Sequence, residues 1–344
     1  MKKIIFIITL IIILCFSSCA TQENRNIGGS YTSENIVVGK GTAWELPGIL
    51  TLPDSTMPRG GYPAVVIVHG SGPGDMDGTA FAYKSYLDIA DFLSSNGIAV
   101  LRYNKRTLTH GAKMLEQLGG SLTVYEETIE DAVLACALLK ADSRINENKV
   151  FMIGHSLGSM LAPRIQNAGS QKTPRVEFAG LILLAGSPRF FMDLSYDQNV
   201  DYIEKMMTGA EQAAALASLA AWDEQMNIIV NLPDAVAKTV DIQGGMSAYY
   251  LKDLYWHPVT MYLDDIHVPF LILQGSADFQ VSPVKDFEVY KQLLTGRDNV
   301  TFILYEGLNH MFITSTTGYI DEYEIPGNVD IMVLQDIINW ILAL

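Results

Sequence analysis

Cysteine is scarce in this chain, with three in 344 residues. Cys15 and Cys19 lie near the N-terminus, which leaves Cys136 as the only cysteine in the rest of the sequence. One thiol cannot form an internal disulfide. Cys136 falls on the apolar stripe of an expected helix, which indicates a buried structural thiol rather than a nucleophile. No cysteine or histidine cluster has metal-ligand spacing, so no metal is expected.

Basic runs are also missing. Lys and Arg number 23 against 38 Asp and Glu, and the formal net charge is −15 at pH 7. Nucleic-acid-binding proteins need clustered positive charge to neutralise phosphates, so nucleic acid is not an expected partner. The same acidic balance argues against a polyanionic substrate.

Only the N-terminus carries an extended apolar run, and it is too short for a stable membrane span. The run Ile4–Phe16 follows two lysines and precedes Ser17-Ser18-Cys19. This is the order of the charged, apolar and cleavage regions of a signal peptide, here residues 1–19.

The small residues directly before Cys19 resemble a bacterial lipobox. The resemblance implies that Cys19 carries a lipid and anchors the protein to a membrane of the bacterial cell envelope, facing the periplasm or the cell surface. Residues 20–35 are polar and are expected to be a tether. The alternative is an ordinary secretory signal and a secreted protein.

Strands and helices are expected to alternate from residue 36 to residue 344. Apolar runs predict strands at 36–38, 43–52, 64–68, 98–103, 150–153, 178–185, 268–274 and 300–305. Amphipathic stretches predict helices at 83–95, from 123, at 159–168, and from about 326 to 344. Residues 104–122 are polar and no element is predicted there. The alternation predicts an α/β fold, with a mostly parallel central sheet and helices on both faces.

Residues 187–267 interrupt this alternation and are far longer than an ordinary helix-to-strand loop. An alanine-rich stretch at 209–221 predicts helices, and the segment contains six methionines, five of them at 206, 207, 226, 246 and 261. We predict a helical cap, inserted into the main domain, that serves as a lid over a site for apolar groups.

The segment Gly154-His155-Ser156-Leu157-Gly158 has the pattern Gly-x-Ser-x-Gly between a predicted strand and a predicted helix. So tight a turn forces its central residue into a strained conformation, and its glycines leave room for the adjoining backbone. The pattern predicts that Ser156 is a nucleophile.

A nucleophilic serine needs an imidazole base and a carboxylate behind the imidazole. Asp278 and His310 follow the predicted strands 268–274 and 300–305, at the sheet edge where such groups meet. Glu306 is too close in sequence to His310 to face it well. The other candidate acids and bases do not follow either of these two strands. They are Asp264, Asp265, His69, His110, His155, His257 and His267. Asp278 and His310 are therefore the predicted acid and base.

Negative charge that develops on a carbonyl oxygen needs preorganised donors. The Leu157 N–H, at the start of a predicted helix, is one candidate. The loop after the strand 64–68 offers the second, from Gly70, Ser71 or Gly72, and the sequence leaves the choice open.

These motifs resemble those of the α/β-hydrolases over residues 36–344. More narrowly, the segments His69-Gly-Ser-Gly-Pro-Gly-Asp-Met-Asp77 and Leu101-Arg-Tyr-Asn-Lys-Arg106 resemble those of bacterial esterases with broad short-acyl activity. The resemblance implies hydrolysis of small carboxylic esters through an acyl-enzyme, without a cofactor. Serine peptidases and acyltransferases share the fold and remain alternatives, and a catalytically dead, tethered binding protein is the non-enzymatic one.

Overall fold

The computed structural model describes residues 29–243 and 246–344, so the predicted signal peptide, Cys19 and most of the predicted tether lie outside the described residues. Its centre is an eight-stranded sheet in the order β1-β2-β6-β3-β7-β8-β11-β12. The strands are β1 (Tyr31–Val38), β2 (Leu46–Pro53), β3 (Tyr62–Val68), β6 (Ala99–Tyr103), β7 (Ile145–His155), β8 (Leu181–Leu184), β11 (Phe270–Gly275) and β12 (Val300–Tyr305). β2 runs antiparallel to β1 and β6, and the other neighbours are parallel. The predicted mostly parallel sheet is confirmed.

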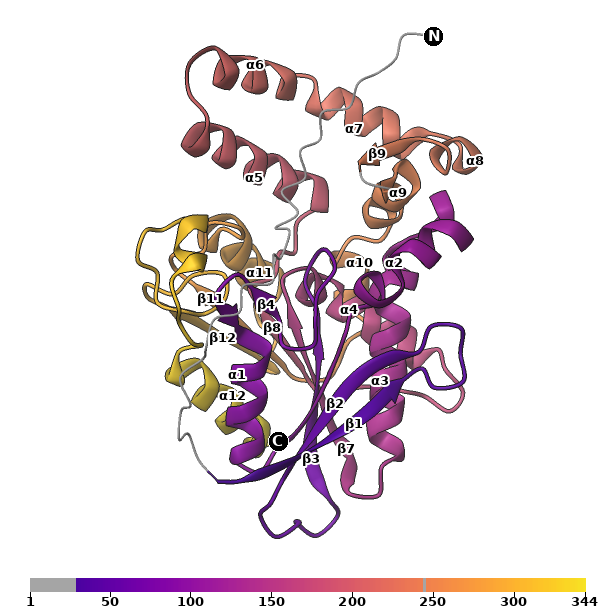
Figure 1. Cartoon of the computed structure of the whole chain (residues 1–344), viewed down its shortest axis with the longest axis vertical. Helices are drawn as coiled ribbons and strands as arrows, with labels where there is room; N and C mark the ends of the chain where they lie inside the picture. Colours follow the sequence, from indigo (N-terminus) through magenta and orange to yellow (C-terminus); the bar gives the residue numbers. More distant parts are fainter. Residues whose placement is uncertain (1–28, 244–245) are drawn as a thin grey trace.

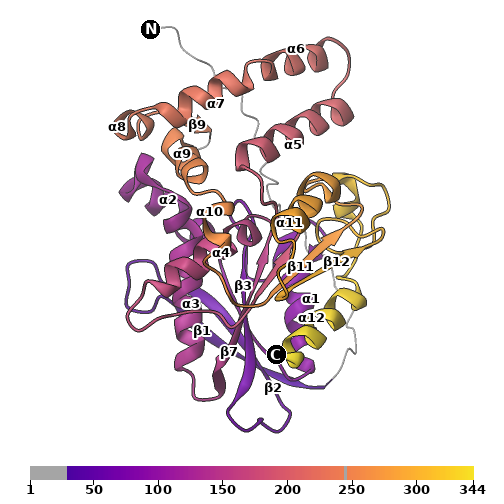
Figure 2. The same cartoon turned by 180° about the vertical axis from the view of Figure 1, so that it is seen from behind.

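Helices cover both faces of this sheet (Figures 1 and 2). α1 (Ser85–Ser95) and α12 (Ile331–Ala343) lie on one face, and α3 (Glu130–Ala141), α4 (Leu157–Ser170) and α11 (Glu288–Leu293) pack on the other. Side chains alternate along a strand, so Val65 and Ile67 of β3 pack with the first group and Val66 and Val68 with the second. None of these four side chains is more than 1% exposed, as expected for a strand covered on both faces.

Between β8 and β11 the chain leaves the sheet and forms a helical insertion. Its helices are α5 (Phe191–Met206), α6 (Gly209–Leu219), α7 (Trp222–Asn231), α8 (Asp234–Ala237), α9 (Ala248–Trp256) and α10 (Thr260–Leu263). Two short strands that were not predicted, β9 (Asp241–Gln243) and β10 (Met246–Ser247), pair antiparallel within it. Figure 1 shows α5–α9 beyond one end of the sheet. Within the described ranges, no helix combines the length and apolarity that crossing a membrane requires.

The first two strands differ in extent from the prediction. β1 begins at Tyr31, which pairs with Pro53, so residues 31–35 belong to the sheet and not to the tether. Their side chains are largely solvent-exposed on an edge strand, which is why their composition resembles that of a linker. β2 begins at Leu46 rather than at residue 43, because residues 39–45 form the connecting turn, with positive φ at Gly39 and Gly41.

The polar stretch 104–122 contains a helix that was not predicted, α2 (Arg106–Gln117). Only Arg106 and Met114 of this helix are buried, and its Leu108 and Leu115 are exposed, so the helix packs no apolar face into the core. Polar contacts hold it instead: His110 Nε2 lies 2.8 Å from the Glu45 carbonyl oxygen, and Lys113 donates to the Ala43 carbonyl. The remaining short elements are β4 (Thr79–Ala80), β5 (Tyr83–Lys84) and single turns at Gly119–Ser121, Tyr125–Ile129, Pro283–Phe287 and Ile320–Glu324.

Candidate active site

Ser156 lies at the turn between β7 and α4. Its φ of 54° and ψ of −115° are a backbone conformation that residues other than glycine rarely adopt. A Cβ on Gly154 would lie 2.5 Å from the Gly158 carbonyl oxygen, and one on Gly158 would lie 2.5 Å from the Val68 carbonyl oxygen. Close backbone approach therefore requires both glycines, as the motif predicts.

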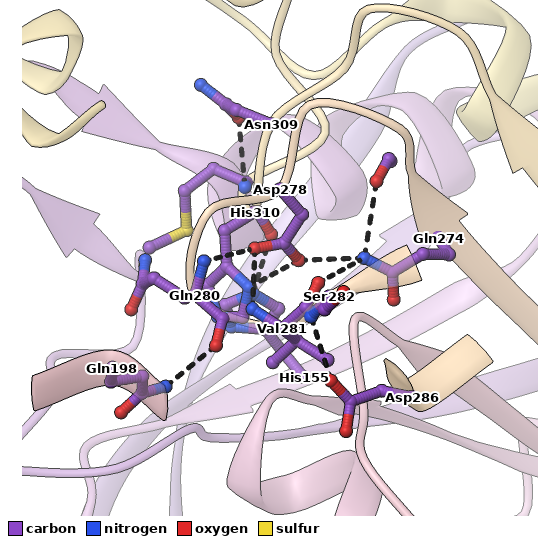
Figure 3. Close-up of polar contacts among 12 residues, drawn as sticks. His155, Gln198, Gln274, Asp278, Gln280, Val281, Ser282, Asp286, Asn309 and His310 are labelled. Carbon is purple, nitrogen blue, oxygen red and sulfur yellow. Dashed lines mark hydrogen bonds and ion pairs between the residues drawn. The ribbon is translucent and has the colours of Figure 1, made fainter. Parts of the chain in front are cut away.

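Asp278 lies in the loop after β11 and is buried (Figure 3). Its Oδ1 accepts hydrogen bonds from the backbone N–H groups of Gln280 (2.8 Å) and Val281 (2.9 Å). Its Oδ2 accepts one from Gln274 Nε2 (2.9 Å) and pairs with His310 Nδ1 at 2.8 Å. Three donors besides the imidazole hold this carboxylate in one orientation, which is what a group that orients a histidine requires.

His310 follows β12 in a loop that its neighbour Asn309 organises. The buried Asn309 side chain accepts from the backbone N–H groups of Met311 (3.0 Å) and Ile313 (3.1 Å) and donates to Glu322 Oε1 (2.7 Å). The sequence analysis missed both Asn309 and Glu322, because an amide beside a histidine has no recognisable pattern. Their contacts fix the backbone from which the His310 ring extends.

The predicted residues surround one cleft, whose empty space, including the part open to solvent, is about 1080 Å³. Its walls contain Ser156, His310, Leu157 and all three residues of the loop Gly70–Gly72. The structure thus brings together side chains that are far apart in the sequence. Asp278 lies behind His310, where its carboxylate contacts the side of the imidazole that carries Nδ1.

Two further histidines beside the cleft are buried and neutral. Burial lowers the pKa of His69 to about 4, and burial together with the nearby His310 lowers the pKa of His155 to about 3. His69 Nε2 lies 2.5 Å from the Tyr103 carbonyl oxygen, and His155 Nε2 lies 3.1 Å from the His310 carbonyl oxygen. These contacts give both histidines structural roles.

The insertion contributes to the cleft, but through other residues than its methionines. Phe191 and Leu194 of α5 line the cleft, together with Met160 of α4. None of the five methionines named in the sequence analysis is among the lining residues in the part of the chain that the structure describes. Met206 and Met261 are instead more than half exposed.

The sheet order, the strained serine turn and the Asp278–His310 pair are those of an α/β-hydrolase. Residues 63–316 match the family model described as Serine aminopeptidase, S33. Because that model covers more than half of the sequence, the chain belongs to this family of α/β-hydrolases.

Known proteins are similar to this chain at two levels. Esterase EstD of Thermotoga maritima is 35% identical over 298 residues, a match that covers 86% of this chain and 65% of EstD. A thermophilic esterase of Thermogutta terrifontis, Est2, superposes with a TM-score of 0.53 at 14% identity. The match covers 90% of this chain and 91% of the Est2 chain. Dipeptidyl peptidase 4 of Porphyromonas gingivalis has the same TM-score at 13% identity, over 91% of this chain and 35% of its own. The two structural likenesses show a shared fold.

Proposed function

We propose that the protein is an exported serine carboxylic ester hydrolase that acts on small or short-acyl esters through an acyl-enzyme. The observation that carries the proposal is the 2.8 Å contact between His310 Nδ1 and Asp278 Oδ2 beside the cleft that Ser156 lines. A serine hydroxyl becomes a strong nucleophile when an imidazole removes its proton and a carboxylate stabilises the resulting cation. These three residues supply those groups.

In the proposed reaction, Ser156 Oγ attacks the ester carbonyl carbon while His310 Nε2 takes its proton. Asp278 stabilises the imidazolium through Nδ1. The carbonyl oxygen becomes an oxyanion that accepts hydrogen bonds from the Leu157 N–H and from an amide of the loop Gly70–Gly72. His310 then protonates the leaving alcohol, and a water molecule activated by the same imidazole hydrolyses the acyl-enzyme.

The cleft lining favours a neutral, apolar substrate. Among the described residues, no Asp, Glu, Lys or Arg lines the cleft, whereas Met160, Phe191 and Leu194 do. An ester with a short acyl chain carries no charge and fits such a surface. The 35% identity to a protein named Esterase EstD supports the same substrate class.

A peptidase is the second candidate, because the family is named for an aminopeptidase. Such an enzyme needs an anionic anchor for a peptide ammonium group, and the acidic residues of α5 are the candidates. Asp197 is already paired with Arg189 (3.0 Å) and Lys285 (2.9 Å), and Asp201 with Lys205 (2.9 Å). Asp193 and Glu204 are the other acidic residues of α5, and none of the four lines the cleft, which favours an ester substrate over a peptide.

We propose that Cys19 carries a lipid that holds the enzyme to a membrane of the bacterial cell envelope. The support is the sequence Ser17-Ser18-Cys19 directly after an apolar run.

The decisive experiment compares the protein with Ser156→Ala on p-nitrophenyl esters from acetate to dodecanoate. We expect hydrolysis with an optimum at short chains and a loss of about 10³-fold or more in the variant. Faster cleavage of aminoacyl p-nitroanilides would favour the peptidase. A protein inert on both substrates and unreactive toward a fluorophosphonate would be a binding protein.

A further inference from the structure

A buried cation holds the loop Gly70–Gly72 from the protein interior. Lys105 Nζ donates a hydrogen bond of 2.7 Å to the Gly70 carbonyl oxygen. The Lys105 side chain is 2% exposed, and Lys105 is not among the residues that line the cleft. The ammonium group therefore contacts this loop from the side opposite the substrate.

This contact determines the direction of one particular amide. The Gly70 carbonyl and the Ser71 N–H belong to the same peptide group, and in a trans peptide the two bonds point in opposite directions. A carbonyl directed at Lys105 in the interior therefore directs the Ser71 N–H toward the cleft. The positive charge of the Lys105 ammonium group, next to the Gly70 carbonyl oxygen, also polarises the peptide and strengthens its N–H as a donor.

The neighbouring amide is already engaged. The Gly70 N–H donates to the Tyr86 hydroxyl at 3.3 Å, so this donor already has an acceptor within the protein. Ser71 is therefore the better candidate than Gly70 for the second oxyanion donor.

We infer that Lys105 is a positioning residue that orients and polarises the Ser71 N–H as the second donor of the oxyanion hole. The inference rests on the proposed esterase function and deepens it. It assigns a role to a side chain that does not line the cleft, and it favours Ser71 over Gly70 as the second donor.

The surroundings of Lys105 explain how a cation is held in the interior. Its ammonium group forms an ion pair with Glu127, which is 7% exposed, and the Tyr250 hydroxyl of α9 donates to the other carboxylate oxygen of Glu127 at 2.5 Å. The backbone N–H of Lys105 also donates to the Gly74 carbonyl oxygen at 2.9 Å. A continuous polar chain thus connects the helical insertion with the oxyanion loop.

Removal of Lys105 alone would leave the Glu127 carboxylate buried and unpaired, which destabilises the fold. The informative variant is therefore Lys105→Met/Glu127→Gln, which removes both charges. We expect it to fold and to lower kcat by about 10- to 100-fold with KM changed by less than about 2-fold, because an oxyanion donor acts in the transition state. Binding of a trifluoromethyl ketone, whose adduct with Ser156 places an oxyanion in the same position, should weaken by a similar factor.

The matched control is Arg106→Met/Asp131→Asn, which removes a buried ion pair one residue away. Arg106 is 1% exposed, and its Nε lies 3.0 Å from Asp131 Oδ2. We expect this control to lower the melting temperature and leave kcat unchanged. If the folded Lys105 double variant kept the wild-type kcat and ketone affinity, the inference would be wrong. The proposed function fails separately, if Ser156→Ala is as active as the wild type.

Discussion

His155, the residue before the predicted nucleophile, is hydrogen-bonded to the backbone of the predicted base: its Nε2 lies 3.1 Å from the carbonyl oxygen of His310. A carbonyl can only accept, so Nε2 carries the proton and Nδ1 accepts from the Tyr86 hydroxyl, 3.1 Å away. In this neutral tautomer both ring nitrogens have hydrogen-bond partners. The serine turn and the His310 loop are thus connected through a side chain outside the predicted triad.

This connection predicts a loss of stability on acidification. The pKa of His155 is lowered by burial to about 3, from 6.5 in the unfolded chain. Between pH 6.5 and pH 3, His155 is protonated in the unfolded chain and neutral in the folded protein. The free energy of unfolding therefore falls as the pH decreases below 6.5. The slope is up to about 1.4 kcal/mol per pH unit for this histidine, and His69, with a pKa of about 4, adds to it.

Urea unfolding of the wild type and of His155→Gln at pH 7, 6 and 5 measures this contribution. The pKa of Asp131 is raised by burial to about 6, which acts in the opposite direction, but it cancels in the difference between the two proteins. We expect the wild type to lose more stability than the variant over this range. Parallel curves would show that His155 is not held neutral.

Asp278→Asn should abolish most of the activity. The new amide NH₂ would face either His310 Nδ1 or the backbone N–H groups of Gln280 and Val281. In both arrangements a hydrogen-bond donor faces another donor, and no hydrogen bond forms there. We expect kcat to fall by about 10³- to 10⁴-fold in an ester assay. Glu306→Gln is the control, because Glu306 is exposed and should leave kcat unchanged. An active Asp278→Asn would exclude Asp278 as the orienting acid.

Two Gly→Ala substitutions should have opposite effects on stability. At Gly158 the new Cβ would lie 2.5 Å from the Val68 carbonyl oxygen, so the backbone must shift. We expect the free energy of unfolding to fall by more than about 2 kcal/mol and the activity to be lost. At Gly111, inside α2, no atom lies within 4 Å of the new Cβ, and the helix should gain up to about 1 kcal/mol. Chemical denaturation of both variants measures the free energies of unfolding. Equal effects would contradict the close approach at Gly158.

Cys19→Ala should release the protein from the membrane. A cell that expresses the full chain should incorporate labelled fatty acid into the wild type and not into the variant, because the Cys19 thiol is the proposed lipid acceptor. Fractionation should then place the wild type with membranes. A wild-type protein that stays unlabelled and soluble would indicate an ordinary secretory signal.

Most of the sheet could be predicted because its strands are buried on both faces. The run at residues 64–68 is apolar throughout, and a strand of this composition is stable only where both of its faces are covered, as in the centre of a parallel sheet. The segments that were missed obey other rules: residues 31–35 form an edge strand with exposed polar side chains, and α2 is held by contacts of polar groups. Neither segment packs an apolar face into the core, and both are rich in polar residues.

By itself the sequence determined the chain order of the eight sheet strands, the serine turn at Ser156, and the positions of Asp278 and His310 after successive strands, because periodicity and glycine spacing are local properties of a chain. Only the tertiary structure decided which groups support them. Lys105 lies in a stretch that looks like a polar loop, yet its ammonium group is buried against Gly70 and Glu127. Contacts of this kind join residues far apart in the sequence, and their partners are set by packing, which no local pattern encodes.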